Sequence, residues 1–162
     1  MSPGEAAGGG RIRSPGPTAS GLTAVRLRHP AQTAGEGNDR LRIIRQTVVF
    51  DAADLEAESA FWAAVLGGRA VAEDDWHSIV DAAGERLMDV QFAPNHVPPE
   101  WPDGTQQQQI HLDLHVDDLH AAHDRVMALG ARLLRPAADL DAEEGFQVYA
   151  DPAGHPFCLC WG

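Results

Sequence analysis

The chain has 162 residues and a formal net charge of −12, with 12 basic and 24 acidic residues. This length fits one domain of about 100–200 residues, and a hydrophobic share of 44% is enough for an ordinary core. A chain this acidic repels phosphate backbones, which argues against nucleic acid as a partner, and the sequence lacks both lysine for Schiff-base chemistry and an apolar run of membrane-spanning length.

The first residues differ in charge from the rest of the chain. Residues 1–45 carry seven arginines and three acidic residues, whereas the remainder carries five arginines and 21 acidic residues. Residues 1–40 are rich in Gly, Pro, Ser, Ala and Arg without hydrophobic periodicity, so they bury too little surface to offset their ordering entropy. We expect a disordered tail or a start codon placed too far upstream, with a basic tether as the alternative. The segment lacks the apolar stretch of a secretory signal.

A folded domain would then begin near residue 41, and its first module is predicted to cover residues 43–93. The alternating residues 43–51 predict a strand. Asp54 can cap a helix at 55–66, which two glycines end. Three short strands are predicted to follow, at 69–73, 76–81 and 86–92.

The second half of the domain shows the same order of elements. Residues 94–108 are rich in proline and glutamine and predict an irregular linker. A second module is expected over 109–162. It begins with a strand at 109–116 and a helix at about 118–129. The predicted strands that complete it are 131–135, 145–150 and 156–161.

The two modules are related by an internal repeat. The segments 47–55 and 111–119 both end in Asp-Leu, and Asp118 follows Asp54 by 64 residues. The predicted helices also end alike, in Leu-Gly-Gly-Arg and Leu-Gly-Ala-Arg, with an offset of 63 residues. The repeat therefore predicts two copies of one β-α-β-β-β unit.

Three segments of the sequence resemble the vicinal oxygen chelate superfamily, which includes glyoxalase I, bleomycin-resistance proteins, extradiol dioxygenases and fosfomycin-resistance enzymes. They are residues 48–67, residues 111–132 and the turn Asp151-Pro-Ala-Gly154. The closest branch is the glyoxalase-like domain proteins of high-GC bacteria. The features similar to that branch are Phe61-Trp62, Trp101-Pro102 and His111-Leu-Asp-Leu114.

The resemblance implies an α+β fold of two tandem βαβββ modules. Their strands would form a curved mixed sheet or open barrel with helices outside and a ligand in the cleft. Strand alternation fits this arrangement, because His111, Asp113 and His115 share one face of the strand at 109–116. These three are the candidate catalytic residues. The candidate ligand-binding residues are Thr47, Gln91, Trp76, Trp101 and Cys158.

Metal-using members of the superfamily hold the ion with one side chain from the first and one from the last strand of each module. The matching positions here are Thr47, Gln91, His111 and Cys158. Thr47 is a poor ligand, and Cys158 replaces the carboxylate expected at its position. His111, Gln91 and Cys158 are the candidate metal ligands. Because the set is degenerate, we expect no bound metal, with Zn²⁺, Ni²⁺, Mn²⁺ or Fe²⁺ as the alternative.

Two functional hypotheses follow, and both have a small molecule as the partner. In the first, the chain is a glyoxalase-like lyase or isomerase acting on a small oxygenated molecule. In the second, it is a metal-free protein that sequesters a drug or metabolite, as bleomycin-resistance proteins do, with cationic ligands favoured by the acidic body. A purely structural or partner-binding domain is a third reading.

The cysteines indicate the compartment. Cys158 and Cys160 lie two positions apart on one predicted strand, a poor geometry for a mutual disulfide. A reduced pair predicts a cytosolic protein. The sequence leaves open whether one chain closes the cleft or whether two chains exchange modules in a homodimer.

Overall fold

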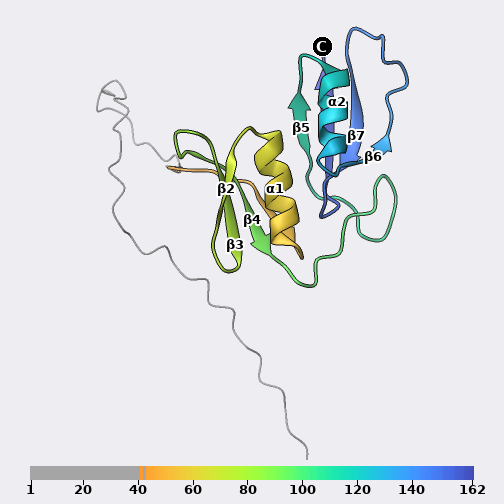
Figure 1. Cartoon of the computed structure of the whole chain (residues 1–162). Coiled ribbons are helices and arrows are strands. Elements are labelled where there is room, and N and C mark those ends of the chain that lie inside the picture. The colour runs from red at the N-terminus through yellow and green to blue at the C-terminus, as the bar shows by residue number, and fades with distance from the viewer. Residues whose placement is uncertain (1–40, 42) are drawn as a thin grey trace, which may run out of the picture. The chain divides into compact units, whose positions relative to one another are not determined.

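The computed structural model describes residues 41 and 43–162, so the predictions for residues 1–40 lie outside the described part. Residues 42–162 form one compact unit. The described residues fold into two helices and two four-stranded sheets (Figure 1). Neither helix is long and apolar enough to cross a membrane.

Module one is a mixed sheet with one helix against it. Its strands are β1 (Val49–Ala52), β2 (Arg69–Ala72), β3 (Trp76–Val80) and β4 (Arg86–Phe92), and its helix is α1 (Leu55–Val65). The strand order is β1-β4-β3-β2, with β1 parallel to β4 and the other pairs antiparallel. Placing β1 beside β4 brings the first and last strands of the module together.

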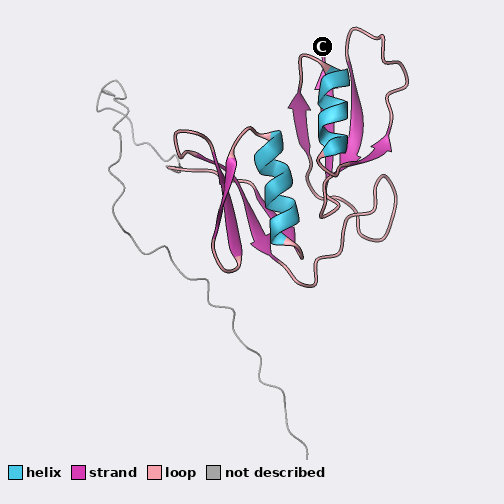
Figure 2. Ribbon diagram, in the orientation of Figure 1, coloured by secondary structure: helices cyan, strands magenta, loops and turns pink. Residues whose placement is uncertain are grey.

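Module two repeats this arrangement. Its strands are β5 (Leu112–His115), β6 (Arg132–Arg135), β7 (Gly145–Ala150) and β8 (Pro156–Trp161), and its helix is α2 (Leu119–Ala128). The order is β5-β8-β7-β6, again with one parallel pair, β5 and β8. Figure 2 shows the same succession of strand, helix and three strands in both halves. The predicted α+β fold of two tandem βαβββ modules is confirmed, with both sheets unclosed.

The repeated Asp-Leu step begins both helices. The Asp54 carboxylate accepts a hydrogen bond from the amide of Ala57 at 3.0 Å. The Asp118 carboxylate accepts the corresponding bond from Ala121 at 2.9 Å. Each bond satisfies one of the helix's otherwise unpaired N–H groups, so the repeat in the sequence is a repeated cap.

The first strand of each module is shorter than the alternating sequence predicts. β1 pairs with β4 only from Val49 to Ala52, and β5 pairs with β8 only from Leu112 to His115. Alternation continues before each strand, but a strand also needs a hydrogen-bonded neighbour. His111 therefore lies immediately before β5 rather than within it.

The hydrophobic core joins the two modules. Trp62 on α1 is fully buried, and its ring contacts Phe61 at 5.3 Å and Phe157 on β8 at 5.4 Å between centroids. Phe61 and Phe157 are also in contact, at 5.8 Å. The helix of module one thus packs against the last strand of module two.

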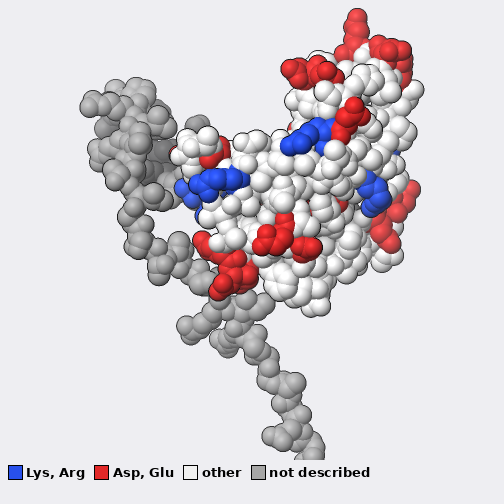
Figure 3. Space-filling view, in the orientation of Figure 1, with Lys and Arg blue, Asp and Glu red and all other residues white. Residues whose placement is uncertain are grey.

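Charged side chains are unevenly spread over the surface. On the face shown in Figure 3, acidic side chains gather in several places, with smaller groups of arginines between them. This distribution accords with the net charge of −12 for the whole chain.

Candidate functional site

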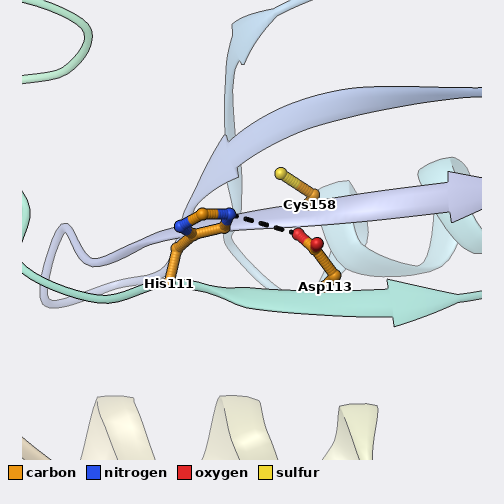
Figure 4. Close-up of side chains that lie close together, drawn as sticks. All are labelled: His111, Asp113 and Cys158. Carbon is orange, nitrogen blue, oxygen red and sulfur yellow. Dashed lines mark ion pairs between the residues drawn. The ribbon is translucent and has the colours of Figure 1, made fainter.

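Three side chains with metal-binding atoms come together on the sheet of module two. They are His111, Asp113 and Cys158, whose nitrogen, oxygen and sulfur ligand atoms all lie within 4.8 Å of one another. Figure 4 shows His111 and Asp113 directed toward each other beside β5, with Cys158 on the neighbouring strand β8. The cluster contains two of the three candidate metal ligands, His111 and Cys158, and two of the three candidate catalytic residues, His111 and Asp113.

The alternation of the two strands explains why these side chains meet. Phe157 and Leu159 are 0% and 1% exposed and belong to the core under the helices. Cys158, between them, therefore faces the opposite side of the sheet. Asp113 is aligned with Cys158 across the parallel pair and faces the same way, because Leu112 and Leu114 pack on the core.

The imidazole of His111 lies between two polar groups. Its Nε2 is 3.3 Å from Oδ1 of Asp113, and these side chains are 42% and 51% exposed. Its Nδ1 is 3.4 Å from Nε2 of Gln108, at the end of the linker. A ligand entering from solvent can therefore reach the imidazole and the carboxylate together.

Cys158 is a neutral thiol in this environment. Burial, followed by contact with the Asp113 carboxylate and then by Cys160, raises the pKa of Cys158 to about 12. Burial and Asp113 also raise the pKa of Cys160. Because the thiolate is the reactive form, neither free cysteine is set up as a nucleophile.

A pocket of about 150 Å³ opens beside the cluster. Its walls come from the linker and from module two: Trp101, Gln108, His111, Phe146, Val148, Pro156 and Cys158. An apolar cavity of roughly this volume accommodates a molecule of the size of benzene. The pocket thus suits a small ligand with an apolar part against Trp101 and Phe146 and a polar part against His111.

Comparison with known proteins identifies the family. The sequence profile described as "Glyoxalase-like domain" matches residues 47–160. The chain belongs to the glyoxalase-like domain family. No curated protein matches the sequence significantly.

Solved structures share the fold of this glyoxalase-like domain at low sequence identity. The fosfomycin resistance protein FosX from Listeria monocytogenes is 14% identical, with 75% of this chain and 95% of that chain covered and a TM-score of 0.55. FosX from Mesorhizobium loti is 18% identical, with coverages of 75% and 94% and a TM-score of 0.54. A glyoxalase-related enzyme from Fulvimarina pelagi is 21% identical, with coverages of 74% and 89% and a TM-score of 0.51. These likenesses place the chain in the vicinal oxygen chelate fold.

The donor set of the cluster fits zinc. An imidazole, a carboxylate and a thiol together match the nitrogen, oxygen and sulfur ligands that Zn²⁺ accepts. Asp113, predicted from the sequence as a catalytic residue, adds to this cluster a carboxylate that the predicted set of metal ligands did not include. Its alternation with His111 on one strand was the available signal.

The four positions expected from the superfamily do not all meet in this way. Gln91 on β4 is aligned with Asp51, whereas Asp89 is aligned with Val49. Since Asp113 and Cys158 form the corresponding pair in module two, Asp89 takes the position equivalent to Cys158. Its side chain is 3% exposed and bonds Arg86 at 3.1 Å, while Oδ1 has no partner among the described residues.

Most of the remaining candidates lie outside the pocket. Thr47 precedes β1, Trp76 begins β3 and Gln91 is exposed on β4, and none of them lines the pocket at His111. Trp101 does line it, and also borders a second cavity of about 360 Å³. His115 is exposed at the end of β5 and aligned with Cys160.

A second polar cluster, which the sequence did not reveal, ties the modules together. The indole N–H of Trp62 donates to Glu58 at 2.9 Å and to Asp151 at 3.0 Å. Glu58 also accepts the backbone N–H of Ala153 at 2.9 Å. Asp151 accepts the N–H groups of Gly154 and His155 at 2.9 and 2.7 Å. These bonds lock the Asp-Pro-Ala-Gly turn against α1.

The Glu58 carboxyl in this second cluster holds a proton at neutral pH. Desolvation by burial, then the hydrogen bond and charge of Asp151, raises the pKa of Glu58 to about 9. Glu58 is 0% exposed and Asp151 is 4% exposed. Each carboxyl oxygen of Glu58 and Asp151 already accepts a hydrogen bond from the protein. The cluster therefore stabilises the contact between the two modules and is not a binding site.

Proposed function

We propose that this glyoxalase-like domain is an enzyme that binds a small oxygenated molecule beside His111, Asp113 and Cys158 and moves a proton within it, as a lyase or isomerase does. The observation that supports the proposal is the convergence of three zinc-compatible donors at the edge of a benzene-sized pocket. A perturbed, partly exposed polar cluster beside an apolar pocket is the usual arrangement of an active site.

The side chains have separate roles in this proposal. His111, Asp113 and Cys158 would hold a Zn²⁺-class ion, which would supply Lewis acidity toward a substrate oxygen. Trp101 and Phe146 pack against the apolar part of the substrate and exclude water on two sides of the pocket. Holding the substrate between apolar walls and polar donors fixes the orientation that proton transfer requires.

His115 is the proposed proton acceptor. It follows Asp113 by two positions on β5 and lies on the same face of the strand, about 7 Å further along. It is exposed and has no ion-pair partner among the described residues. Histidine is the commonest general base in enzymes, and His111 is occupied as a ligand.

The size of the pocket favours the enzyme over a protein that sequesters large drugs. A space of about 150 Å³ admits a few heavy atoms and excludes a glycopeptide. Metal-free binding of a small metabolite stays the alternative. Its supporting observation is that His111, Asp113 and a neutral Cys158 already contact one another.

We also propose a cytosolic location and a bacterial source. The support for the location is that both cysteines are free, as expected in a reducing compartment. A homodimer is proposed as well, because Val49, Val71 and Leu87 leave apolar side chains exposed on module one.

The experiment that tests the proposed function is a thermal-shift series with divalent ions. We expect Zn²⁺ to raise the melting temperature of the wild-type protein, because an ion bound only by the native state stabilises it. The His111→Ala variant should lose this shift, whereas His120→Ala, exposed on α2, should keep it. A wild-type protein unaffected by Zn²⁺, Ni²⁺, Mn²⁺ and Fe²⁺ would refute the metal-dependent enzyme.

A further inference from the structure

The side-chain carboxamide of Gln108 lies beside the imidazole of His111, and only one of its two ends has a hydrogen-bond partner. Its Nε2 lies 3.4 Å from the imidazole Nδ1. Its Oε1 is buried and has no hydrogen-bond partner among the described residues. A buried acceptor without a partner costs about 1–3 kcal/mol, so native proteins rarely keep one without a reason.

The tautomer of the neutral His111 imidazole depends on the partners of its two ring nitrogens. With Nε2 at 3.3 Å from the Asp113 carboxylate, the proton of a neutral imidazole is on Nε2, and Nδ1 is an acceptor. Gln108 then donates its amide N–H to Nδ1. In this arrangement Oε1 of Gln108 is the atom left over.

A metal ion at the cluster reverses these requirements. When Nε2 is the ligand it carries no proton, so the proton moves to Nδ1 and needs an acceptor. A half-turn of the Gln108 carboxamide puts Oε1 where Nε2 was, because the two ends of the amide have nearly the same shape. Oε1 then accepts the Nδ1–H of His111, and the amide N–H₂ takes the place that Oε1 leaves.

We propose that Gln108 is a positioning residue that selects the metal-binding tautomer of His111 by accepting its Nδ1–H through Oε1. This inference rests on the proposed function, since it requires a zinc-class ion at His111, Asp113 and Cys158. It adds an outer ligand shell that the family profile does not specify. Metal-bound histidines usually donate their other N–H to such an acceptor, which orients the ring and raises its basicity.

The position of Gln108 suits this role. It belongs to the linker segment that also contributes Trp101 to the pocket wall, so it reaches His111 from outside β5. Its neighbour Gln109 is exposed, and its side chain donates to the backbone of Gln107 at 3.4 Å instead. Two adjacent glutamines thus offer a variant and a matched control.

The test measures zinc affinity by competition with a chromophoric chelator. We expect Gln108→Leu to weaken zinc binding by roughly 10- to 100-fold, the usual effect of removing an outer-shell partner. Gln108→Glu should keep or tighten it, because a carboxylate accepts Nδ1–H more strongly. Gln109→Leu should match the wild type, and the far-UV circular dichroism of each variant should be unchanged.

A second readout follows the tautomer directly. In ¹⁵N-edited spectra of the zinc-loaded protein, His111 should carry its proton on Nδ1, and in the zinc-free protein on Nε2. Equal zinc affinity of the wild type and Gln108→Leu, or a proton kept on Nε2 with zinc bound, would overturn this inference alone. A wild-type protein without zinc affinity would overturn it together with the proposed function.

Discussion

Cys158 is the residue whose chemistry departs most from the superfamily pattern. A thiol where a carboxylate is expected would weaken binding of hard ions and favour zinc. Its raised pKa means that an ion must displace a proton to bind it. The site should therefore prefer Zn²⁺ over Mn²⁺, which prefers oxygen ligands.

Replacing this thiol tests whether it is a ligand. Cys158→Ser should weaken zinc binding by more than the roughly 10- to 100-fold cost of an outer-shell change. Cys160→Ser is the matched control, since Cys160 lies on the same strand outside the cluster and should leave the affinity unchanged. Isothermal titration of both variants distinguishes them, and equal losses would remove Cys158 from the ligand set.

Glu58 gives the domain a pH dependence of known sign. The raised pKa means that the folded state keeps a proton that the unfolded chain releases between pH 4.5 and about 9. The free energy of unfolding therefore falls as pH rises through that window, with a limiting slope of about 1.4 kcal/mol per pH unit.

Glu58→Gln should flatten this dependence. A neutral carboxamide can donate to Asp151 and still accept from Ala153, so the variant should be more stable than the wild type near pH 9. Urea unfolding at several pH values measures the effect, and Glu56→Gln, exposed on the same helix, is the control. A wild-type stability that rises between pH 6 and 9 would contradict a protonated Glu58 in the folded state.

At the level of elements, the sequence contained most of the fold. Alternation and glycine stops placed both helices and all eight strands, because the repeated pattern has to bury one face of each sheet under one helix. The starts of β1 and β5 could not be predicted, because alternation does not show where hydrogen-bonded pairing begins, which is at Val49 with Asp89 and at Leu112 with Phe157. That difference leaves His111 before β5 at the pocket wall.

The same limit explains what was missed at the site. His111 and Asp113 could be placed on one face from strand alternation, and Cys158 could be placed with His111 from the resemblance to the superfamily. Gln108 lies in a linker without periodicity. The Glu58–Trp62–Asp151 cluster depends on a hydrogen bond between Trp62 and Asp151, which are 89 positions apart in the sequence. Contacts of that kind depend on how the modules pack, which no local pattern encodes.

The cap of α2 should contribute measurably to stability. Asp118→Ala removes the acceptor for the Ala121 N–H and should lower the free energy of unfolding by about 0.5–2 kcal/mol. Asp117→Ala changes an exposed neighbour and should have little effect. Chemical denaturation measures both, and zinc affinity should stay constant, because α2 holds none of the ligands.

For the whole molecule, the shared core predicts that the two modules unfold together. Trp62, Phe61 and Phe157 connect α1 with β8, and the buried carboxyl pair depends on the indole N–H. Trp62→Phe keeps an aromatic side chain but removes that donor and part of the buried ring, so it should cost at least about 1–3 kcal/mol. Calorimetry should show one transition, shifted down by a few degrees; two separate transitions would contradict the shared core.

The most direct test of the central claim is the zinc content of the intact protein after equilibration with Zn²⁺ and removal of free ion. We predict one zinc per chain for the wild type and for Cys160→Ser, and a large loss for His111→Ala, Asp113→Ala and Cys158→Ser. No zinc in the wild type, or the same zinc content in all of these variants, would contradict a metal site at His111, Asp113 and Cys158.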